Sequence, residues 1–458
     1  MLIRRFATLL IGLTLAACST NHIGAAPSVP NAIPAQIEGS ASGAAATALK
    51  YVVTFYPLWF TYNQHAHATT NRPVGPVRMG PLYHEVVAPN DDTLYASSYL
   101  ELSQQPVILT IPRSKVLWSL LSTAPYGDVY DTGIAASGVY ALTGPNWSGS
   151  LPSGATQVKM PTTFSQLIIR ADKYSENGSD RHVAADEFRR AIHIATLSAY
   201  QSNPDAGKTL IVPLAALSIP YKTIADDTIK TNPMKFLKGL QTAVHSSNTP
   251  PLDAASKALS DRFDALFDAQ NPDSAALSAG TRKAYDDILN CYLSATGKTN
   301  WVTFDDIGTT WTDLQRSSIT EFLQYGNNLS AAAYYQAFKD GKGVALDGSR
   351  HSYVIRFARN QIPQAKRFWS ITAYTPNSIT LISNAAHKYV VGSYTPGLRM
   401  NKDGSISIYI APLLPAGAPT ANWLPSAEGP FNVMLRVYGP EGSSAAGTYV
   451  PPAVQILK

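Results

Sequence analysis

Charged residues of either sign are scarce in this chain. Of its 458 residues, 36 are Lys or Arg and 31 are Asp or Glu, which makes the charged fraction 15%. This is well below the roughly one quarter found in an average globular protein. With 45% hydrophobic residues the chain is not a disordered polyelectrolyte. It has no Lys/Arg run that could neutralise a row of phosphates, so we expect no nucleic-acid partner.

Cysteine is almost missing too, with only Cys18 and Cys291 present. If Cys18 carries a lipid, no disulfide can form within one chain, and a cysteine-based metal site or redox pair is excluded. His65 and His67 have a spacing found on metal-binding strands, but no third ligand follows at a characteristic distance, so we expect no metal. The chain has no P-loop, no Gly-x-Gly-x-x-Gly after a strand and no Gly-x-Ser-x-Gly elbow. We therefore expect no cofactor and no α/β-hydrolase esterase.

The amino-terminal segment has the layout of an export signal. Arg4 and Arg5 precede an apolar stretch at 9–15, which is too short to span a membrane and is followed by Leu15-Ala16-Ala17-Cys18. The last four residues resemble a bacterial lipobox, which predicts a signal peptide at 1–17 and lipidation at Cys18. An ordinary signal peptide with an incidental cysteine is the alternative. Ser19 resembles the sorting pattern for the outer membrane of Gram-negative bacteria, so we expect a lipid-anchored envelope protein.

Residues 18–44 have the composition of a flexible tether, and folding is expected to begin near Ala45. Apolar and aromatic residues at helical spacing predict a helix over 51–62, which Pro57 should kink or end. The period then changes to two. In 93–102, Leu94, Ala96, Leu100 and Leu102 fall on one strand face, and Thr93, Tyr95, Ser97 and Tyr99 on the other.

The middle of the chain reads as helical, with helices expected over 184–200, 234–244, 254–267, 281–293 and 317–338. Strand alternation returns after Gly343. This block order predicts an α+β fold with two antiparallel β-sandwich (jelly-roll-like) units flanking a helical insert. The expected boundaries are 45–178 for the first unit with its helix, 179–342 for the insert and 343–458 for the second unit.

Several motifs in these strands resemble known families. The segment 87–95, VAPNDDTLY, with 99–102, 131–133, 144–147 and 169–170, resembles the core of the DUF1254 domain. The segments 368–374, 402–405, 422–425 and 435–440 resemble the DUF1214 domain. Both names denote domains of unknown function, so the resemblance implies a paired β-architecture, often secreted, and no settled reaction.

The candidate site begins at the turn before the strand at 93–102. Asp92, beside Tyr95 and with Arg170 as partner, is predicted to be catalytic, because a carboxylate among tyrosine hydroxyls can transfer protons or hold sugar hydroxyls. Arg170, Arg356 and Arg436 lie mid-strand, where pairing with Asp92 or Asp131 is expected. In the alternative interpretation Asn90 and Asp92 only fix the turn. The predicted substrate-binding residues are Asn90, Tyr99, Asp131, Trp369, Tyr374, Trp423 and Arg436.

Two functions of different classes remain open from the sequence. One is an envelope enzyme that acts on a glycan-like or other small-molecule substrate by hydrolysis or elimination. The other is a non-catalytic envelope module that binds a glycan or a protein partner through its aromatic residues. Carboxyl groups with Arg or Tyr in one cleft favour the enzyme, whereas a flat aromatic face favours binding.

Replacing Cys18 tests the predicted anchor. Cys18→Ala should abolish lipid attachment, because the thiol accepts the acyl chain, and should leave an uncleaved or soluble exported form. Radiolabelled palmitate incorporation into wild type and variant measures this directly. Label on the Cys18→Ala protein would reject the lipobox interpretation.

Overall fold

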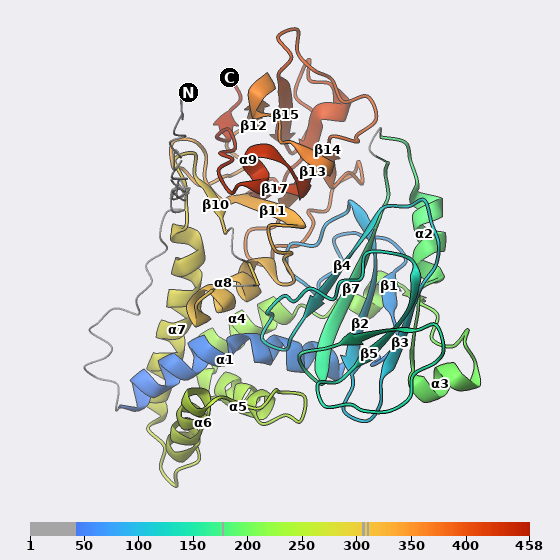
Figure 1. Cartoon of the computed structure of the whole chain (residues 1–458). Helices are drawn as coiled ribbons and strands as arrows, with labels where there is room; N and C mark the ends of the chain where they lie inside the picture. Colours follow the sequence, from blue (N-terminus) through green and yellow to red (C-terminus); the bar gives the residue numbers. More distant parts are fainter. Residues whose placement is uncertain (1–42, 176–177, 305–306, 309–310) are drawn as a thin grey trace, which may run out of the picture.

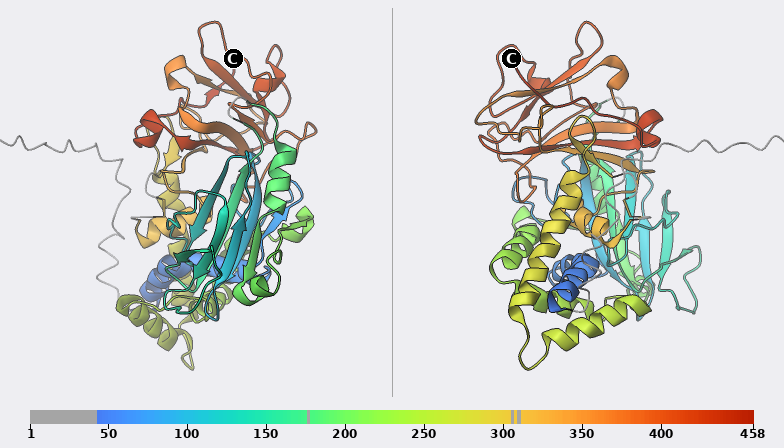
Figure 2. Two further views of the ribbon diagram at one scale, coloured as in Figure 1. Left: turned by 45° about the vertical axis from the view of Figure 1, so that its right-hand side comes forward. Right: turned by 90° about the vertical axis from the view of Figure 1, so that its left-hand side faces the viewer.

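The computed structural model describes residues 43–458 except 176–177, 305–306 and 309–310. The predicted signal peptide, Cys18 and the predicted tether up to residue 42 lie outside this range, and Ala44, the last residue expected in the tether, already begins a helix. Figure 1 shows two β-units and a group of helices: strands β1–β7 form one unit, strands β10–β17 lie above, and the helices pack beside and below. The two views of Figure 2 show the carboxyl-terminal unit above both the helices and the first β-unit.

The first β-unit is a sandwich of two sheets. One sheet has the order β4 (Trp118–Thr123), β7 (Phe164–Asp172), β2 (Thr93–Glu101), β1 (Val74–Pro76) and β9 (Leu210–Val212). The other has the order β6 (Thr156–Lys159), β5 (Gly138–Thr143), β3 (Val107–Ile111) and β8 (His193–Thr196). Leu94, Ala96, Leu100 and Leu102 lie in the hydrophobic core of this unit, as the alternation predicts.

The second β-unit repeats this arrangement. Its inner sheet has the order β10 (Trp301–Thr303), β11 (Ala332–Ala337), β17 (Asn432–Pro440), β13 (Ala365–Tyr374) and β14 (Val390–Gly392). Its outer sheet has the order β16 (Trp423–Pro425), β15 (Ile406–Ala411), β12 (Tyr353–Phe357) and β18 (Gln455–Ile456). Apolar side chains between the two sheets form its core. The α+β class with sandwich-like units is confirmed.

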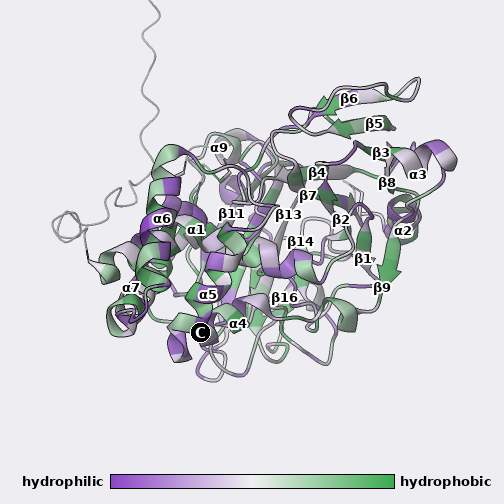
Figure 3. Cartoon of the chain, turned by 90° about the horizontal axis from the view of Figure 1, so that it is seen from below, coloured by the Kyte–Doolittle hydropathy of each residue, from purple (hydrophilic) through white to green (hydrophobic). Residues whose placement is uncertain are grey.

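The helices pack around α1 (Ala44–Ala66), which continues through Pro57 and does not end there. Its partners are α4 (Tyr221–Thr231), α5 (Pro233–Val244), α6 (Ala254–Phe267), α7 (Ser274–Ser294) and α8 (Asp313–Leu323). Seen from below, in Figure 3, α1, α5, α6 and α7 lie to one side of β2, β3, β5 and β7. A Cβ atom at Gly280 would lie 2.0 Å from the Ala45 carbonyl oxygen, so only glycine allows α1 and α7 to cross this closely. Within the described ranges, no helix combines the length and the hydrophobicity needed to cross a bilayer.

Two expected helices are partly strand. The segment 184–200 divides into α2 (His182–Arg190), β8 and α3 (Leu197–Ser202), because β8 pairs with β3 of the first unit. The segment 317–338 divides into α8 and β11, and β11 pairs with β17 of the second unit. In both places backbone pairing with a distant strand overrides a local helical pattern. The stretch expected as a helical insert therefore also supplies strands to both sandwiches.

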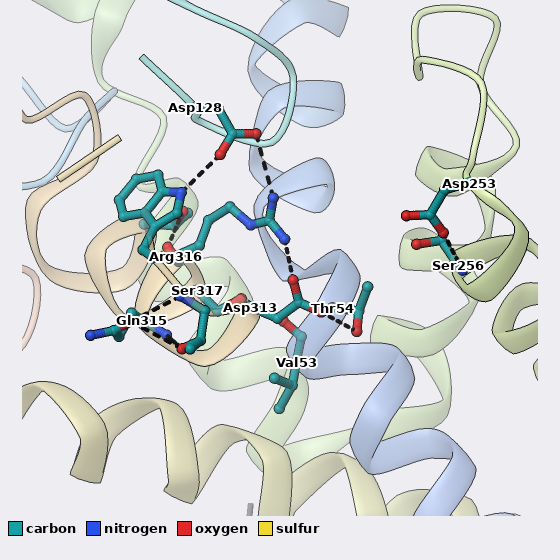
Figure 4. A network of polar contacts seen from close by, with 12 residues as sticks. Val53, Thr54, Asp128, Asp253, Ser256, Asp313, Gln315, Arg316 and Ser317 are labelled. Atoms are coloured by element: carbon teal, nitrogen blue, oxygen red, sulfur yellow. Dashed lines mark hydrogen bonds and ion pairs between the residues drawn. The ribbon is translucent and has the colours of Figure 1, made fainter. Parts of the chain in front are cut away.

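A polar network ties the first β-unit to the helices near the start of α8 (Figure 4). Asp128, from a loop of the first unit, accepts hydrogen bonds from Trp311 Nε1 at 2.8 Å and from Arg316 at 3.4 Å. Asp313 forms an ion pair with Arg316 and accepts a hydrogen bond from Thr54 of α1 at 2.8 Å. Gln315 closes a capping box at this helix end, which satisfies backbone N–H groups that would otherwise lack partners.

A charged cluster is buried where α1, α4 and α8 meet. Lys222 forms ion pairs with Asp226 at 2.8 Å and with Glu321, whose other oxygen accepts a hydrogen bond from the Tyr56 hydroxyl at 2.7 Å. The Glu321 side chain is fully buried. Burial raises the pKa of Glu321 to about 7, and the Lys222 charge opposes this shift. Removing one partner would leave the other charge in an apolar interior.

Replacing Lys222 alone should leave two buried carboxyl groups, those of Asp226 and Glu321, without a cation. We expect Lys222→Met to lower the free energy of unfolding by about 3–5 kcal/mol, the scale of a broken buried ion pair. The double variant Lys222→Met/Glu321→Leu should lose less than the two single variants together. Urea unfolding of the wild type, Lys222→Met, Glu321→Leu and the double variant measures this coupling. Lys257→Met, in the exposed pair with Asp261, is the control and should stay within roughly 0.5 kcal/mol of wild type.

Candidate functional site

A cavity of about 230 Å³ lies between the first β-unit, the second β-unit and the helices. Its walls come from β1, β2, β7 and β9, from the loops around 83–90 and 323–326, and from β11 and β17. This volume is below the roughly 300–1,000 Å³ of pockets for drug-sized ligands, so it suits a small molecule. Seven tyrosines line it: Tyr83, Tyr95, Tyr99, Tyr221, Tyr325, Tyr334 and Tyr438.

The floor of the cavity is the face of β2 and β7 that points away from the sandwich core. Their antiparallel register places Tyr95 opposite Arg170, Ser97 opposite Ile168, and Tyr99 opposite Gln166. These are alternate residues, and all six line the cavity. The polar face predicted from the sequence alternation is therefore the floor of the cavity.

Two buried guanidinium groups form one end of the cavity. Arg170 is 6% exposed, lies 5.6 Å from the Tyr95 ring centroid, and donates to Asn327 Oδ1 at 3.3 Å and to the Tyr325 carbonyl at 3.1 Å. Arg436 is 2% exposed and donates to the carbonyl of Ala88 and to Thr372 Oγ1. Neither cation has a carboxylate within ion-pair distance among the described residues, so the expected pairing with Asp92 or Asp131 does not form.

The backbone of the cavity wall is strained where it meets these arginines. Ala88 has φ 48° and Tyr325 has φ 63°, a left-handed conformation that costs non-glycine residues about 1–3 kcal/mol. Both residues turn their carbonyl oxygen toward a guanidinium group, Ala88 to Arg436 and Tyr325 to Arg170. The two hydrogen bonds therefore help to hold two loops in the conformation that shapes the cavity.

A carboxyl group lies in another part of the lining. Glu85 is partly buried, and the Tyr83 hydroxyl lies 3.4 Å from its Oε2. Burial raises the pKa of Glu85 to about 7, whereas the hydrogen bond from Tyr83 lowers it. At neutral pH both protonation states are populated, which suits a group that takes up and releases protons. The Tyr83 ring packs edge-on against the Tyr95 ring, 6.3 Å between centroids, and so links Glu85 to the guanidinium end.

Gln64, near the end of α1, organises the hydrogen bonds beside Glu85. Its Oε1 accepts from the hydroxyls of Tyr325 at 2.6 Å and Tyr99 at 3.2 Å. Its Nε2 donates to the Glu85 carbonyl at 2.8 Å, and its amide exchanges reciprocal hydrogen bonds with the amide of Gln324. A side chain 1% exposed thus joins α1, the 83–90 loop, β2 and the segment after α8.

The mouth of the cavity lies at the end of α1. Of the lining residues, His67, Thr69 and Ala216 are exposed to solvent. The Nδ1 atom of His67 lies within hydrogen-bond distance, 3.2 Å, of the Tyr221 hydroxyl. His65 instead contacts Thr70 and Asn248, so the two histidines do not converge. Across the described part of the chain, no group of three or more His, Cys, Asp or Glu side chains lies close enough to hold a metal ion.

The structure brings half of the predicted site residues together. Those that line the cavity are Asn90, Tyr95, Tyr99, Arg170 and Arg436. The others lie elsewhere: Asp131 is exposed in a loop, and Trp369 is in the core of the second β-unit. The ring nitrogen of Trp423 donates to the Ala411 carbonyl on the outer sheet. Tyr374 is fully buried and donates to the Pro89 carbonyl at 2.8 Å across the interface between the units.

Asp92 also lies outside the cavity lining, in the interface between the two β-units. It is 1% exposed and accepts hydrogen bonds from the hydroxyls of Ser370, at 3.0 Å, and Tyr394. Burial raises the pKa of the Asp92 carboxyl, and nearby Arg436 opposes that shift. Asn90 Oδ1 accepts from the backbone N–H groups of Asp92 and Thr93, both at 3.1 Å, which is the turn described by the alternative interpretation.

The sequence reasoning missed Glu85, Gln64 and Tyr325. Glu85 lies two residues before the 87–95 motif, but nothing in the sequence shows that its carboxyl becomes buried. Gln64 carried no signal in the sequence, because its partners Gln324 and Tyr325 are 260 and 261 residues away. Such contacts follow from the packing of the helices against the first β-unit.

Two family models match the chain, and both are described as protein of unknown function. DUF1254 matches residues 63–196 and DUF1214 matches residues 331–442, which confirms the resemblance of the motifs. The search of curated proteins found no match. The solved structure of the VPA0106 protein from Vibrio parahaemolyticus has a TM-score of 0.60 at 20% identity, covering 91% of this chain and 100% of that one. This likeness shows a shared fold. An uncharacterised Burkholderia cenocepacia protein has a TM-score of 0.45 at 14% identity, covering 94% and 91%.

The Asp92→Asn variant distinguishes a stabilising role of Asp92 at the interface from a catalytic role in the cavity. The variant keeps the size of the side chain but replaces one acceptor oxygen facing a buried hydroxyl, so we expect it to cost about 1–3 kcal/mol of stability. Ligand binding in the cavity by the remaining folded protein should change less than twofold. Thermal unfolding measures the change in stability, and calorimetric titration and a turnover assay on the same preparation measure binding and catalysis. A 10²-fold or larger loss of turnover at unchanged stability would instead give Asp92 the catalytic role expected from the sequence.

Proposed function

This chain is a DUF1254 and DUF1214 domain-containing protein, and we propose that it is an enzyme acting on a small, hydroxyl-rich, glycan-like substrate in the cavity between the two domains. The observation that carries this proposal is Glu85, a carboxyl with its pKa near 7 in a small cavity that also holds arginine and tyrosine side chains. Perturbed carboxyl groups in clefts are typical of acid–base catalysts. The lipobox-like sequence at 15–18 supports an envelope location for this activity.

The lining favours elimination over hydrolysis by two carboxyl groups. Glycoside hydrolases of the usual kind need a pair of carboxyls roughly 5–9.5 Å apart. Among the described lining residues Glu85 is the single carboxyl. In an elimination, one base removes a proton from carbon, the electron pair of that bond forms the double bond, and the leaving oxygen takes a proton from a neighbouring hydroxyl. Glu85 suits the base, and the nearby Tyr99 hydroxyl suits the donor.

The non-catalytic alternative receives less support. It relied on aromatic rings presented by the second β-unit. Trp369 and Tyr374 are 3% and 0% exposed, and Trp423 uses its ring nitrogen on the protein's own backbone. Seven tyrosines line the cavity instead, beside a titratable carboxyl. This arrangement provides proton transfer as well as binding.

Glu85→Gln tests the proposal. The amide keeps the shape but cannot transfer a proton at neutral pH, so we expect turnover to fall by about 10²–10⁴-fold with little change in KM. If Glu85 is the base, wild-type turnover should rise as the pH passes through about 7, because the carboxylate form increases. Product is measured on a panel of neutral and acidic oligosaccharides by release of reducing ends and by ultraviolet absorbance of the new double bond.

Glu428→Gln provides the control. Glu428 is exposed in the second β-unit and does not line the cavity, so this variant should keep wild-type turnover and melting temperature. Turnover of the folded Glu85→Gln protein at the wild-type rate would remove Glu85 from the mechanism. Binding of an oligosaccharide by the wild type without any product would favour the non-catalytic module.

A further inference from the structure

We infer that the ligand of the cavity is a small carboxylate of the sugar-acid class, with its carboxylate bound by Arg170 at the guanidinium end. The sugar-acid identity rests on the proposed function. The anion site itself rests on the packing of the two arginines.

The first argument is the contrast between cations at this interface. Lys173 and Arg367 lie at the same junction of the two β-units but outside the cavity lining, and each has a carboxylate partner, Asp91 and Asp172. Arg170 and Arg436 line the cavity, and their hydrogen-bond partners are neutral oxygens. Arg436 still has the Asp92 carboxylate nearby, whereas Arg170 lies among the tyrosines Tyr95, Tyr334 and Tyr438. A buried cation without a counterion is costly. The counterion that Arg170 lacks is therefore expected from the ligand.

The second argument is the spare donor capacity of Arg170. Its Nη1 and Nη2 each carry two N–H bonds, and each donates one hydrogen bond to the protein, to Asn327 and to the strained Tyr325 carbonyl. These two hydrogen bonds hold the guanidinium group in place at the cavity. A pair of N–H groups on a guanidinium group can bind both oxygens of a carboxylate.

The third argument concerns the charge of the lining. Glu85 is the single carboxyl among the described lining residues, whereas Arg170 and Arg436 supply two permanent positive charges, so the cavity favours an anion.

Calorimetric titration of the full-length protein with D-glucuronate, D-glucose and inorganic phosphate tests the inference. We expect glucuronate to bind at least tenfold more tightly than glucose, and its affinity to fall with added salt. Equal affinity for glucuronate and glucose would overturn the inference. Tighter binding of phosphate than of glucuronate would overturn the assignment to a carboxylate. These measurements need no variant, so they stand even if changes at Arg170 impair folding.

Variants then locate the site. Arg170→Gln should lose tenfold or more in glucuronate affinity and keep the weak affinity for glucose, whereas Arg170→Lys should retain part of the preference. Arg356→Gln is the matched control, because Arg356 is an exposed mid-strand arginine paired with Asp403. Unchanged glucuronate affinity in folded Arg170→Gln would overturn the role of Arg170. Glucuronate binding without turnover of any acidic glycan would refute the enzyme and leave the anion site. Turnover without a preference for acidic ligands would support the enzyme and refute the anion site.

Discussion

The antiparallel pairing of β2 with β7 places two chemically different surfaces back to back. Along nine paired positions, from Thr93 opposite Asp172 to Glu101 opposite Phe164, side chains alternate between the faces. One face is apolar and meets the second sheet of its sandwich, whereas the other carries Tyr95, Tyr99, Gln166 and Arg170. The polar face is also covered, so its hydrogen-bonding groups need partners other than bulk water. Gln64 of α1 accepts from Tyr99, the Asn90 backbone donates to Tyr95, and the 325–327 segment after α8 accepts from Arg170.

The cover over this face comes from segments far apart in the chain. Gln64 of α1, the loop at 83–90, the turn after α8 and strands β11 and β17 all contribute lining residues. Arg436 reaches across to the Ala88 carbonyl, and Tyr438 accepts a hydrogen bond from Asn90 Nδ2 at 2.9 Å. The cavity is therefore a property of the assembled chain, and neither β-unit encloses it by itself.

Much of the fold could be predicted from the sequence, because alternation and helical spacing are local. The alternation in 93–102 identified both faces of β2, and the helix at 254–267 has the predicted bounds. The two misassigned helices contain β8 and β11, whose strand character depends on distant partners. The site shows the same limit. Arg170 and Tyr95 stand out as polar groups on strands. Alternation also places Trp369 and Tyr374, five residues apart, on opposite faces of β13, but it could not tell that both faces would be buried. Glu85 gains its character from burial, which appears only once the units pack.

Helix α1 separates the point where the chain enters the described fold from the mouth of the cavity. The chain enters the described fold at Ala44, and the cavity opens beside His67, just past the other end of this 23-residue helix. At 1.5 Å per residue the two points are about 34 Å apart. Any anchor or fusion partner joined ahead of Ala44 would attach at a point remote from the mouth of the cavity. A surface-immobilised form tethered through its amino terminus should thus leave the route for a diffusing ligand open, whereas a graft beside Thr69 would obstruct it.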